Sequence, residues 1–260
     1  MPQGGVARRA TKIKEVRQQT QHTVLLLDAG STLFGEALAT QSQGRVVIEA
    51  MNLMGYDAMT VGQMDLVQGV EVLLARAKEA RFPILSANLV GAQDRKPLLP
   101  PYTVLTRDGV RYGILGLSEP KANNWPNVSQ VVSVLDPVET AKKYLPEVRA
   151  RSDVVILLSH LGLEEDKALA QAVPGIDIII GGRSRKLLPA PEIVGQTVIT
   201  QVGYDGEWLG RLDVTFDEQK HVRDPRTEII SLGPEVADDP QLKALVESYS
   251  KRYPTPTPAK

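Results

Sequence analysis

The chain has 260 residues, of which 42% are hydrophobic and 23% are charged, so it can bury a sizeable core and has the composition of a globular protein. A net charge of −1 gives no electrostatic reason to expect nucleic acid or an anionic membrane as a partner. The lack of cysteine excludes disulfides and thiol chemistry, and the three histidines, none near another in sequence, argue against a histidine-rich metal cluster.

No run of about 18 apolar residues occurs, so we expect no membrane-spanning helix. The first residues are basic and polar and do not have the pattern of an apolar export signal. The localisation therefore stays open.

Helical and strand patterns alternate in the first half of the chain. The segment VARRATKIKEVRQQ at residues 6–19 has the spacing of an amphipathic helix. The continuous apolar run TVLLLD at residues 23–28 is typical of a strand buried on both faces. We expect further helices at residues 40–54 and 70–80 and further strands at residues 58–61 and 83–87.

The second half begins with a predicted hairpin, since residues 102–106 and 110–117 flank a tight turn. Residues 121–133, which include Trp125, have the pattern of a loop. A helix should start at Asp136-Pro137, because aspartate caps a helix and proline fits its first turn. We then expect strands at 154–159 and 176–180, helices at 137–151, 164–172 and 239–253, three antiparallel strands at 198–202, 208–216 and 222–230, and a proline-rich tail at 254–260.

This order of elements predicts an α/β protein with two sheets packed face to face and helices outside. Polar residues follow several of the buried strands, at the edge where open α/β sheets bind ligands. We therefore expect one shared site formed by Ser31, Gln63, His160, Arg183 and Arg185.

Several segments resemble the calcineurin-like metallophosphoesterases, specifically the N-terminal domain of bacterial 5′-nucleotidases and UDP-sugar hydrolases. These segments are GGVARRATKIKEVR, LLLDAGS, MNLMGYDAMTVGQMD, FPILSANL, DVVILLSHLG, PGIDIIIGGRSR and GRLDVTF. The resemblance implies a four-layer α-β-β-α sandwich over residues 1–232. Residues 233–260 resemble the helix and linker that lead to the family's second domain, which is absent from this sequence.

In this family two divalent metals, such as Mn, Zn or Mg, activate a water and clamp the phosphate. The resemblance places an Asp and a His ahead of residue 4, on a first strand that this sequence lacks. The family's other ligands are an Asp, an Asn, a single His and a His-x-His pair, and a His directly after the Asn helps to stabilise or protonate the transition state. In this chain the matching positions are Ser31, Gln63 and Met64, His160, and Arg183 and Arg185.

Only His160 is unchanged, and arginine keeps its proton, so Arg183 and Arg185 would repel a dication instead of ligating it. Two unit charges 4 Å apart interact with about 4 kcal/mol at an effective dielectric of 20. We therefore predict that the two-metal site is lost and that no metal cofactor is bound.

The two arginines suggest that guanidinium groups now hold a phosphate or carboxylate by forked hydrogen bonds. The alternative is that they lie on the surface or pair with acids such as Asp28 or Asp65. His160 is either a retained ligand or a histidine held by backbone hydrogen bonds at a strand end. Ser31 and Gln63 also suit the turns of any α/β protein.

The leading hypothesis is a catalytically inactive binding or assembly module that takes a small anion or a nucleotide. The runner-up is a working hydrolase of nucleotides, UDP-sugars or other phosphate monoesters with a metal-poor site, in which His160 is the sole candidate base. A missing first strand would leave unpaired backbone edges in the sheet. We therefore also expect this gap in the sheet to be closed by rearrangement, by the N-terminal segment, by a protein partner or by a second copy.

Overall fold

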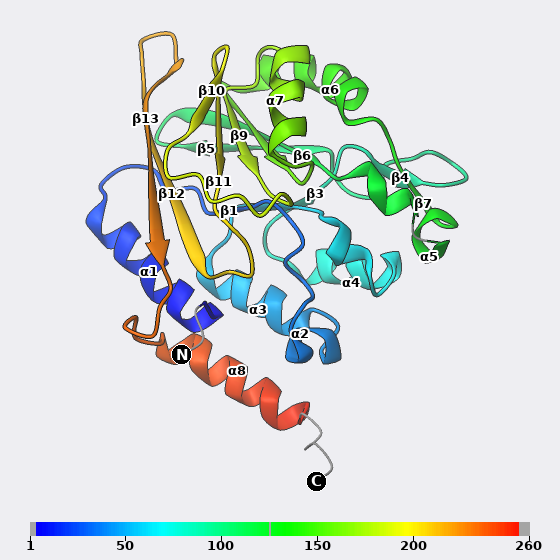
Figure 1. Cartoon of the computed structure of the whole chain (residues 1–260), viewed down its shortest axis with the longest axis vertical. Coiled ribbons are helices and arrows are strands. Elements are labelled where there is room, and N and C mark those ends of the chain that lie inside the picture. The colour runs from blue at the N-terminus through cyan, green and yellow to red at the C-terminus, as the bar shows by residue number, and fades with distance from the viewer. Residues whose placement is uncertain (1–3, 125, 255–260) are drawn as a thin grey trace.

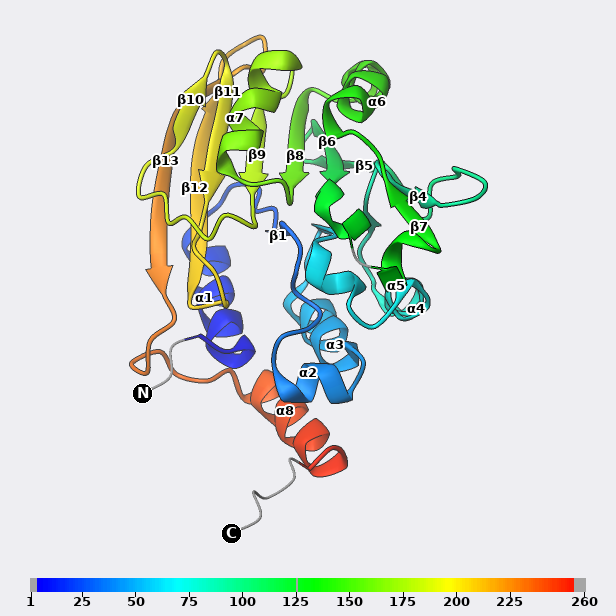
Figure 2. The same ribbon diagram turned by 45° about the vertical axis from the view of Figure 1, so that its right-hand side comes forward.

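The computed structural model describes residues 4–124 and 126–254, so Trp125 and nearly all of the expected proline-rich tail lie outside the described residues. Figures 1 and 2 show helices on two opposite sides of the sheets, with the long strands of residues 208–231 along one edge of the molecule. The helices are α1 (Val6–Gln19), α2 (Ala37–Gln41), α3 (Arg45–Met54), α4 (Val70–Glu79), α5 (Pro126–Ser129), α6 (Pro137–Arg151), α7 (Leu163–Ala172) and α8 (Pro240–Arg252), with 3₁₀ turns η1 (Gln63–Leu66) and η2 (Pro120–Asn124).

The largest sheet has six strands in the order β10-β11-β9-β8-β6-β5, and its four central strands are parallel. These strands are β5 (Tyr102–Arg107), β6 (Val110–Leu117), β8 (Val154–Ser159), β9 (Ile178–Gly181), β10 (Glu192–Val194) and β11 (Thr197–Gln201). A parallel three-stranded sheet contains β1 (Leu27–Asp28), β2 (Ala58–Thr60) and β3 (Ile84–Leu85), and two antiparallel pairs join β12 (Trp208–Phe216) to β13 (Val222–Ser231) and β4 (Leu89–Gly91) to β7 (Val132–Val134).

Alternation along β8 shows how the layers are stacked. Val155 and Leu157 pack with α6 and α7 on one face, whereas Ile156 and Leu158 pack between the sheets, against apolar residues of β2 and β3. A third cluster joins β2 and β3 to α1, α3 and α4. Because successive side chains of a strand point to opposite faces, the uninterrupted apolar run of β8 serves two layers at once. The expected four-layer α-β-β-α sandwich is confirmed.

Many of the predicted elements are present, but the predictions for one helix, one loop and the pairing of the C-terminal strands are wrong. The helix expected at residues 40–54 is broken into α2 and α3, because Gln43 and Gly44 adopt positive φ angles of 51° and 76°. The loop expected at 121–133 contains η2, α5 and the start of β7. The three expected C-terminal strands do not form one antiparallel set, since β11 pairs parallel with β9.

The strand expected at residues 23–28 is wrong in length and in burial. Regular pairing is confined to Leu27–Asp28, and only Leu26 of the six residues is buried. Within the described part of the chain, β1 pairs with β2 alone, so the other edge of the strand has no β-strand partner. β1 nevertheless carries the turn at Ser31.

The C-terminal helix α8 begins at a side-chain cap, since the Asp239 carboxylate accepts hydrogen bonds from the N–H groups of Gln241 and Leu242, both 3.1 Å. Its buried Leu242 packs into the cluster that contains residues of α1 and α3, and Tyr249 donates a hydrogen bond to Glu49 on α3. Helix α8 therefore packs directly on the outer helical layer (Figure 2). In the described residues no helix is long and apolar enough to cross a bilayer.

Candidate functional site

The turns after β1, β2 and β8 meet at one edge of the two sheets, as the sequence predicts. Ser31 lies after β1, Gln63 and Met64 begin η1 after β2, and His160 directly follows β8. The Ser31 Oγ is 2.9 Å from the His160 Nε2, and the Met64 N–H donates to the same Oγ at 3.2 Å. Segments far apart in the chain thus place a hydroxyl, an imidazole and a short 3₁₀ turn together.

His160 is 4% exposed and uses both ring nitrogens. Its Nδ1 is 2.7 Å from the carbonyl oxygen of Ala29, which can only accept a hydrogen bond, so Nδ1 carries the proton. In the neutral ring Nε2 then accepts the hydrogen bond donated by the Ser31 hydroxyl. Burial lowers the pKa of His160, and Arg183 lowers it further, whereas the Ala29 carbonyl and Asp28 oppose the shift. The imidazole is therefore held neutral at pH 7.

Asp65 organises the turns, although the sequence suggested it only as a partner for an arginine. Its buried carboxylate accepts hydrogen bonds from four backbone N–H groups, those of Ser31, Thr32, Leu33 and Gly62, at 2.7, 2.9, 2.9 and 2.8 Å. Burial raises the pKa of Asp65 to about 6, against the effect of these donors. One carboxylate thereby ties the turn after β1 to the turn after β2.

Close packing at the edge leaves no room for a side chain at two glycines. A Cβ on Gly62 would lie 2.3 Å from the Ser31 Oγ and 2.8 Å from the His160 Cε1, and a Cβ on Gly182 would lie 3.0 Å from the His160 Nδ1. Ser31 itself has a positive φ of 60°, which is uncommon for a residue other than glycine. The surrounding turns therefore hold Ser31 in a conformation that it does not favour by itself.

Arg183 and Arg185 follow β9, but they have separate partners. Arg183 forms an ion pair through Nε with Glu119, whose side chain is 4% exposed, and its Nη1 donates to the carbonyl of Leu161 at 3.4 Å. The Arg185 side chain is exposed, and its guanidinium carbon lies 5.1 Å from the ring centroid of Tyr204. The acid that neutralises Arg183 is thus Glu119, which sequence reasoning missed, and not Asp28 or Asp65.

A second set of polar residues lies deeper at the same edge. Asp166, in the first turn of α7, is fully buried and accepts a hydrogen bond from Ser159, and a Cβ on Gly181 would lie 2.5 Å from its Oδ2. Burial raises the pKa of Asp166 to about 7. Ser184 donates to the Gln201 Oε1 at 2.8 Å and accepts from the Leu163 N–H at 3.2 Å. These contacts tie the turn after β9 to the start of α7.

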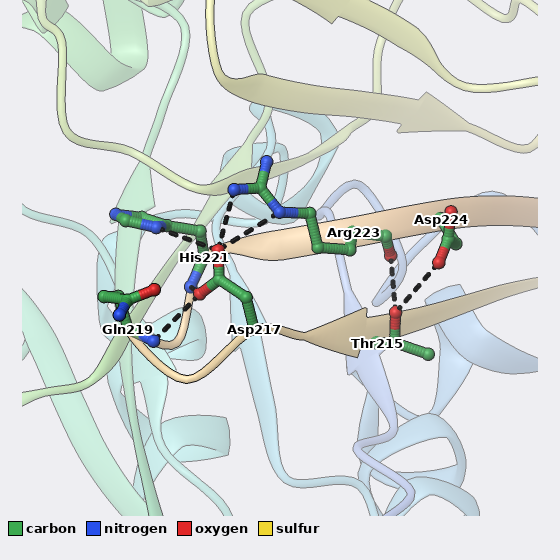
Figure 3. Close-up of polar contacts among 6 residues, drawn as sticks. All are labelled: Thr215, Asp217, Gln219, His221, Arg223 and Asp224. Carbon is green, nitrogen blue, oxygen red and sulfur yellow. Dashed lines mark hydrogen bonds and ion pairs between the residues drawn. The ribbon is translucent and has the colours of Figure 1, made fainter.

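The other two histidines do not join the site. His22 is exposed after α1. His221 lies on the hairpin between β12 and β13, with its Nδ1 3.2 Å from the Asp217 Oδ2, and Arg223 donates to the same oxygen (Figure 3). His221 and Asp177 line the same cavity. Asp177 directly precedes β9 and Arg183 follows it, so this cavity lies at the opposite end of the strand from Arg183.

The donors at this edge do not suit a pair of divalent metals. Among the described residues, no three His, Asp or Glu side chains gather as a metal-binding group. His160 has both nitrogens in hydrogen bonds, and both oxygens of Asp65 accept from backbone N–H groups. A guanidinium cannot act as a ligand, and a serine hydroxyl cannot replace a bridging carboxylate.

Comparison with known proteins places the chain in a superfamily, although no family model matches it. It is 33% identical over 270 residues to bovine 5′-nucleotidase and 32% identical over 267 residues to a snake venom 5′-nucleotidase from Gloydius brevicauda. These alignments cover 95% and 94% of the chain but 47% and 45% of the relatives. The chain therefore spans about half the length of the curated relatives it matches.

Solved structures agree with this relationship. The fold matches a 5′-nucleotidase precursor of Thermus thermophilus with a TM-score of 0.89 and 32% identity, covering 96% of this chain and 54% of that one. It matches the calcineurin-like phosphoesterase YfkN of Bacillus subtilis with a TM-score of 0.82 and 26% identity, covering 97% and 90%. The chain belongs to the calcineurin-like metallophosphoesterase superfamily. Within it, the chain is similar to the N-terminal domains of 5′-nucleotidases.

Proposed function

We propose that this chain is a metallophosphoesterase-fold domain that no longer carries out two-metal hydrolysis and instead acts as a binding module. The observation that carries the proposal is the set of hydrogen bonds at Ser31, His160 and Asp65. These bonds use lone pairs that the side chains would need free in order to bind a metal ion. Rebuilding a metal site would require breaking several of these bonds and placing a dication near Arg183.

The ligand that the edge supports best is a small anion, and Arg185 is the residue that meets it. Arg185 is exposed and stacks on Tyr204, and no carboxylate of the described residues forms an ion pair with it, whereas Arg183 is already paired with Glu119. Guanidinium groups bind phosphate and carboxylate through forked hydrogen bonds. Gln63, in the turn after β2, would add a polar contact at the same edge.

A thermal-shift series with phosphate, sulfate and adenosine monophosphate tests anion binding. We expect stabilisation that Arg185→Ala removes and that Arg226→Ala, a matched change at an exposed arginine on β13, leaves intact. An equal response of the wild type and the Arg185→Ala variant would contradict the role given to Arg185.

The second candidate function is a working phosphoesterase with an altered site. It is supported by the 32% identity to the Thermus thermophilus 5′-nucleotidase precursor and by the neutral imidazole of His160, which could act as a base. Assays of adenosine monophosphate and p-nitrophenyl phosphate with added Mn²⁺ separate the two candidates. Activity that depends on the metal and persists in pure protein would favour this second function.

A further inference from the structure

Ser31 and His160 form a hydroxyl–imidazole pair in which the direction of the proton is fixed. The Ala29 carbonyl holds the proton of His160 on Nδ1, so the lone pair on Nε2 faces the Ser31 hydroxyl at 2.9 Å. A serine becomes a useful nucleophile when an adjacent base is oriented by a third group. Here the third group is a backbone carbonyl, 2.7 Å from the imidazole.

We propose that Ser31 is a metal-independent nucleophile toward uncharged carboxylic esters and that His160 is its general base. The inference rests on the proposed metal-free state of the site, because a metal ion on His160 would occupy the lone pair that accepts the serine proton. It gives the binding edge a covalent chemistry different from the hydrolysis of phosphate esters.

The turn that carries Ser31 is rigid in the way that a nucleophile requires. Ser31 keeps a positive φ of 60°, and three successive N–H groups, from Ser31 to Leu33, donate to the buried Asp65 carboxylate. The half-buried Oγ accepts one hydrogen bond from the Met64 N–H and donates one to His160. One of its two lone pairs therefore remains for attack on a substrate.

The charges around the pair select an uncharged substrate. Asp28 lies close enough to raise the pKa of His160, and Glu119 neutralises the guanidinium of Arg183. A phosphate monoester carries a double negative charge that Asp28 would repel, while Arg183 is already engaged by Glu119. An acyl ester carries no charge in its ground state, so it avoids this repulsion.

The reaction needs no outside oxidant or metal. A lone pair on the Ser31 Oγ forms a bond to the ester carbonyl carbon while the hydroxyl proton moves to the His160 Nε2. The tetrahedral intermediate then breaks its bond to the alcohol oxygen, which leaves with the proton from Nε2. The products are the acylated serine and a free alcohol, and attack by water with the same base would release the carboxylic acid.

Incubation with p-nitrophenyl acetate in the presence of EDTA tests this step, followed by intact mass measurement and peptide mapping. We expect one acetyl group on Ser31 of the wild type, none on that peptide in Ser31→Ala, and a rate about 100-fold lower in His160→Gln. Ser184→Ala is the matched control, because Ser184 lies at the same edge but donates to an amide oxygen and not to a base. It should react like the wild type.

The proposal is overturned if the folded wild type carries no acetyl group at Ser31, or if Ser31 is acetylated at an unchanged rate in His160→Gln. Circular dichroism checks that each variant folds. If a variant does not fold, the peptide map of the wild type alone shows whether Ser31 is acetylated. Because EDTA is present throughout, the result does not depend on metal binding. Failure here would leave the proposed loss of two-metal hydrolysis standing, and that loss is tested separately by metal titration.

Discussion

Arg183 forms an ion pair with Glu119, a carboxylate that is 4% exposed at the end of β6. The pair holds the guanidinium against the protein and limits its availability to a dissolved anion. A buried carboxylate and a partly exposed arginine thus set the charge of the edge where the ligand is expected.

Glu119→Gln should release Arg183 for binding and increase the stabilisation by phosphate or sulfate, because the neutral amide no longer competes for the guanidinium. Thermal shift against phosphate concentration measures the change. Asp153→Asn makes the same change of charge in the ion pair with Arg111, at the opposite ends of β6 and β8, and should leave phosphate binding unchanged. Equal phosphate responses of Glu119→Gln and the wild type would contradict this role of the ion pair.

Asp65→Ala should lower the free energy of unfolding by about 3 kcal/mol or more, since it leaves several buried N–H groups without an acceptor. Urea unfolding followed by circular dichroism measures this loss. Asp94→Ala removes a carboxylate that accepts a single exposed backbone hydrogen bond from Lys96, at 3.1 Å, and should cost far less. Similar losses for the two variants would show that Asp65 does not hold the turns together.

Asp166 should make stability depend on pH. Because burial raises its folded-state pKa from the ordinary 3.8 to about 7, the folded protein binds a proton that the unfolded chain releases in this range. The contribution is fully present below about pH 4 and is lost as the pH rises through 7. Unfolding free energies between pH 4 and 8 should therefore fall more steeply for the wild type than for Asp166→Asn. Parallel curves would place the carboxylate's folded pKa near its ordinary value.

The sequence predicted the layers well because burial on two faces leaves a local signal. Apolar runs marked β8 and β9, and the aspartate–proline pair marked the start of α6. The turn at Asp108-Gly109 likewise marked the hairpin of β5 and β6. In each case the relevant residues lie within a few positions of one another.

Features that depend on distant residues could not be predicted in this way. The run at residues 23–28 looked like a fully buried strand, but its burial depends on neighbours that the run does not encode. The pairing of Arg183 with Glu119 joins two separate segments of the chain, and Ser31 meets His160 across 129 positions. Asp65 resembled any turn aspartate until the fold brought four N–H groups to it.

The central claim is that this edge no longer holds two divalent metals, and titration of the purified, EDTA-treated protein with Mn²⁺ tests it most directly. Isothermal calorimetry combined with elemental analysis after desalting should find well below one tightly bound Mn²⁺ per chain. His160→Ala should not change that value. Two Mn²⁺ ions per chain that remain after desalting and are lost in His160→Ala would contradict the account.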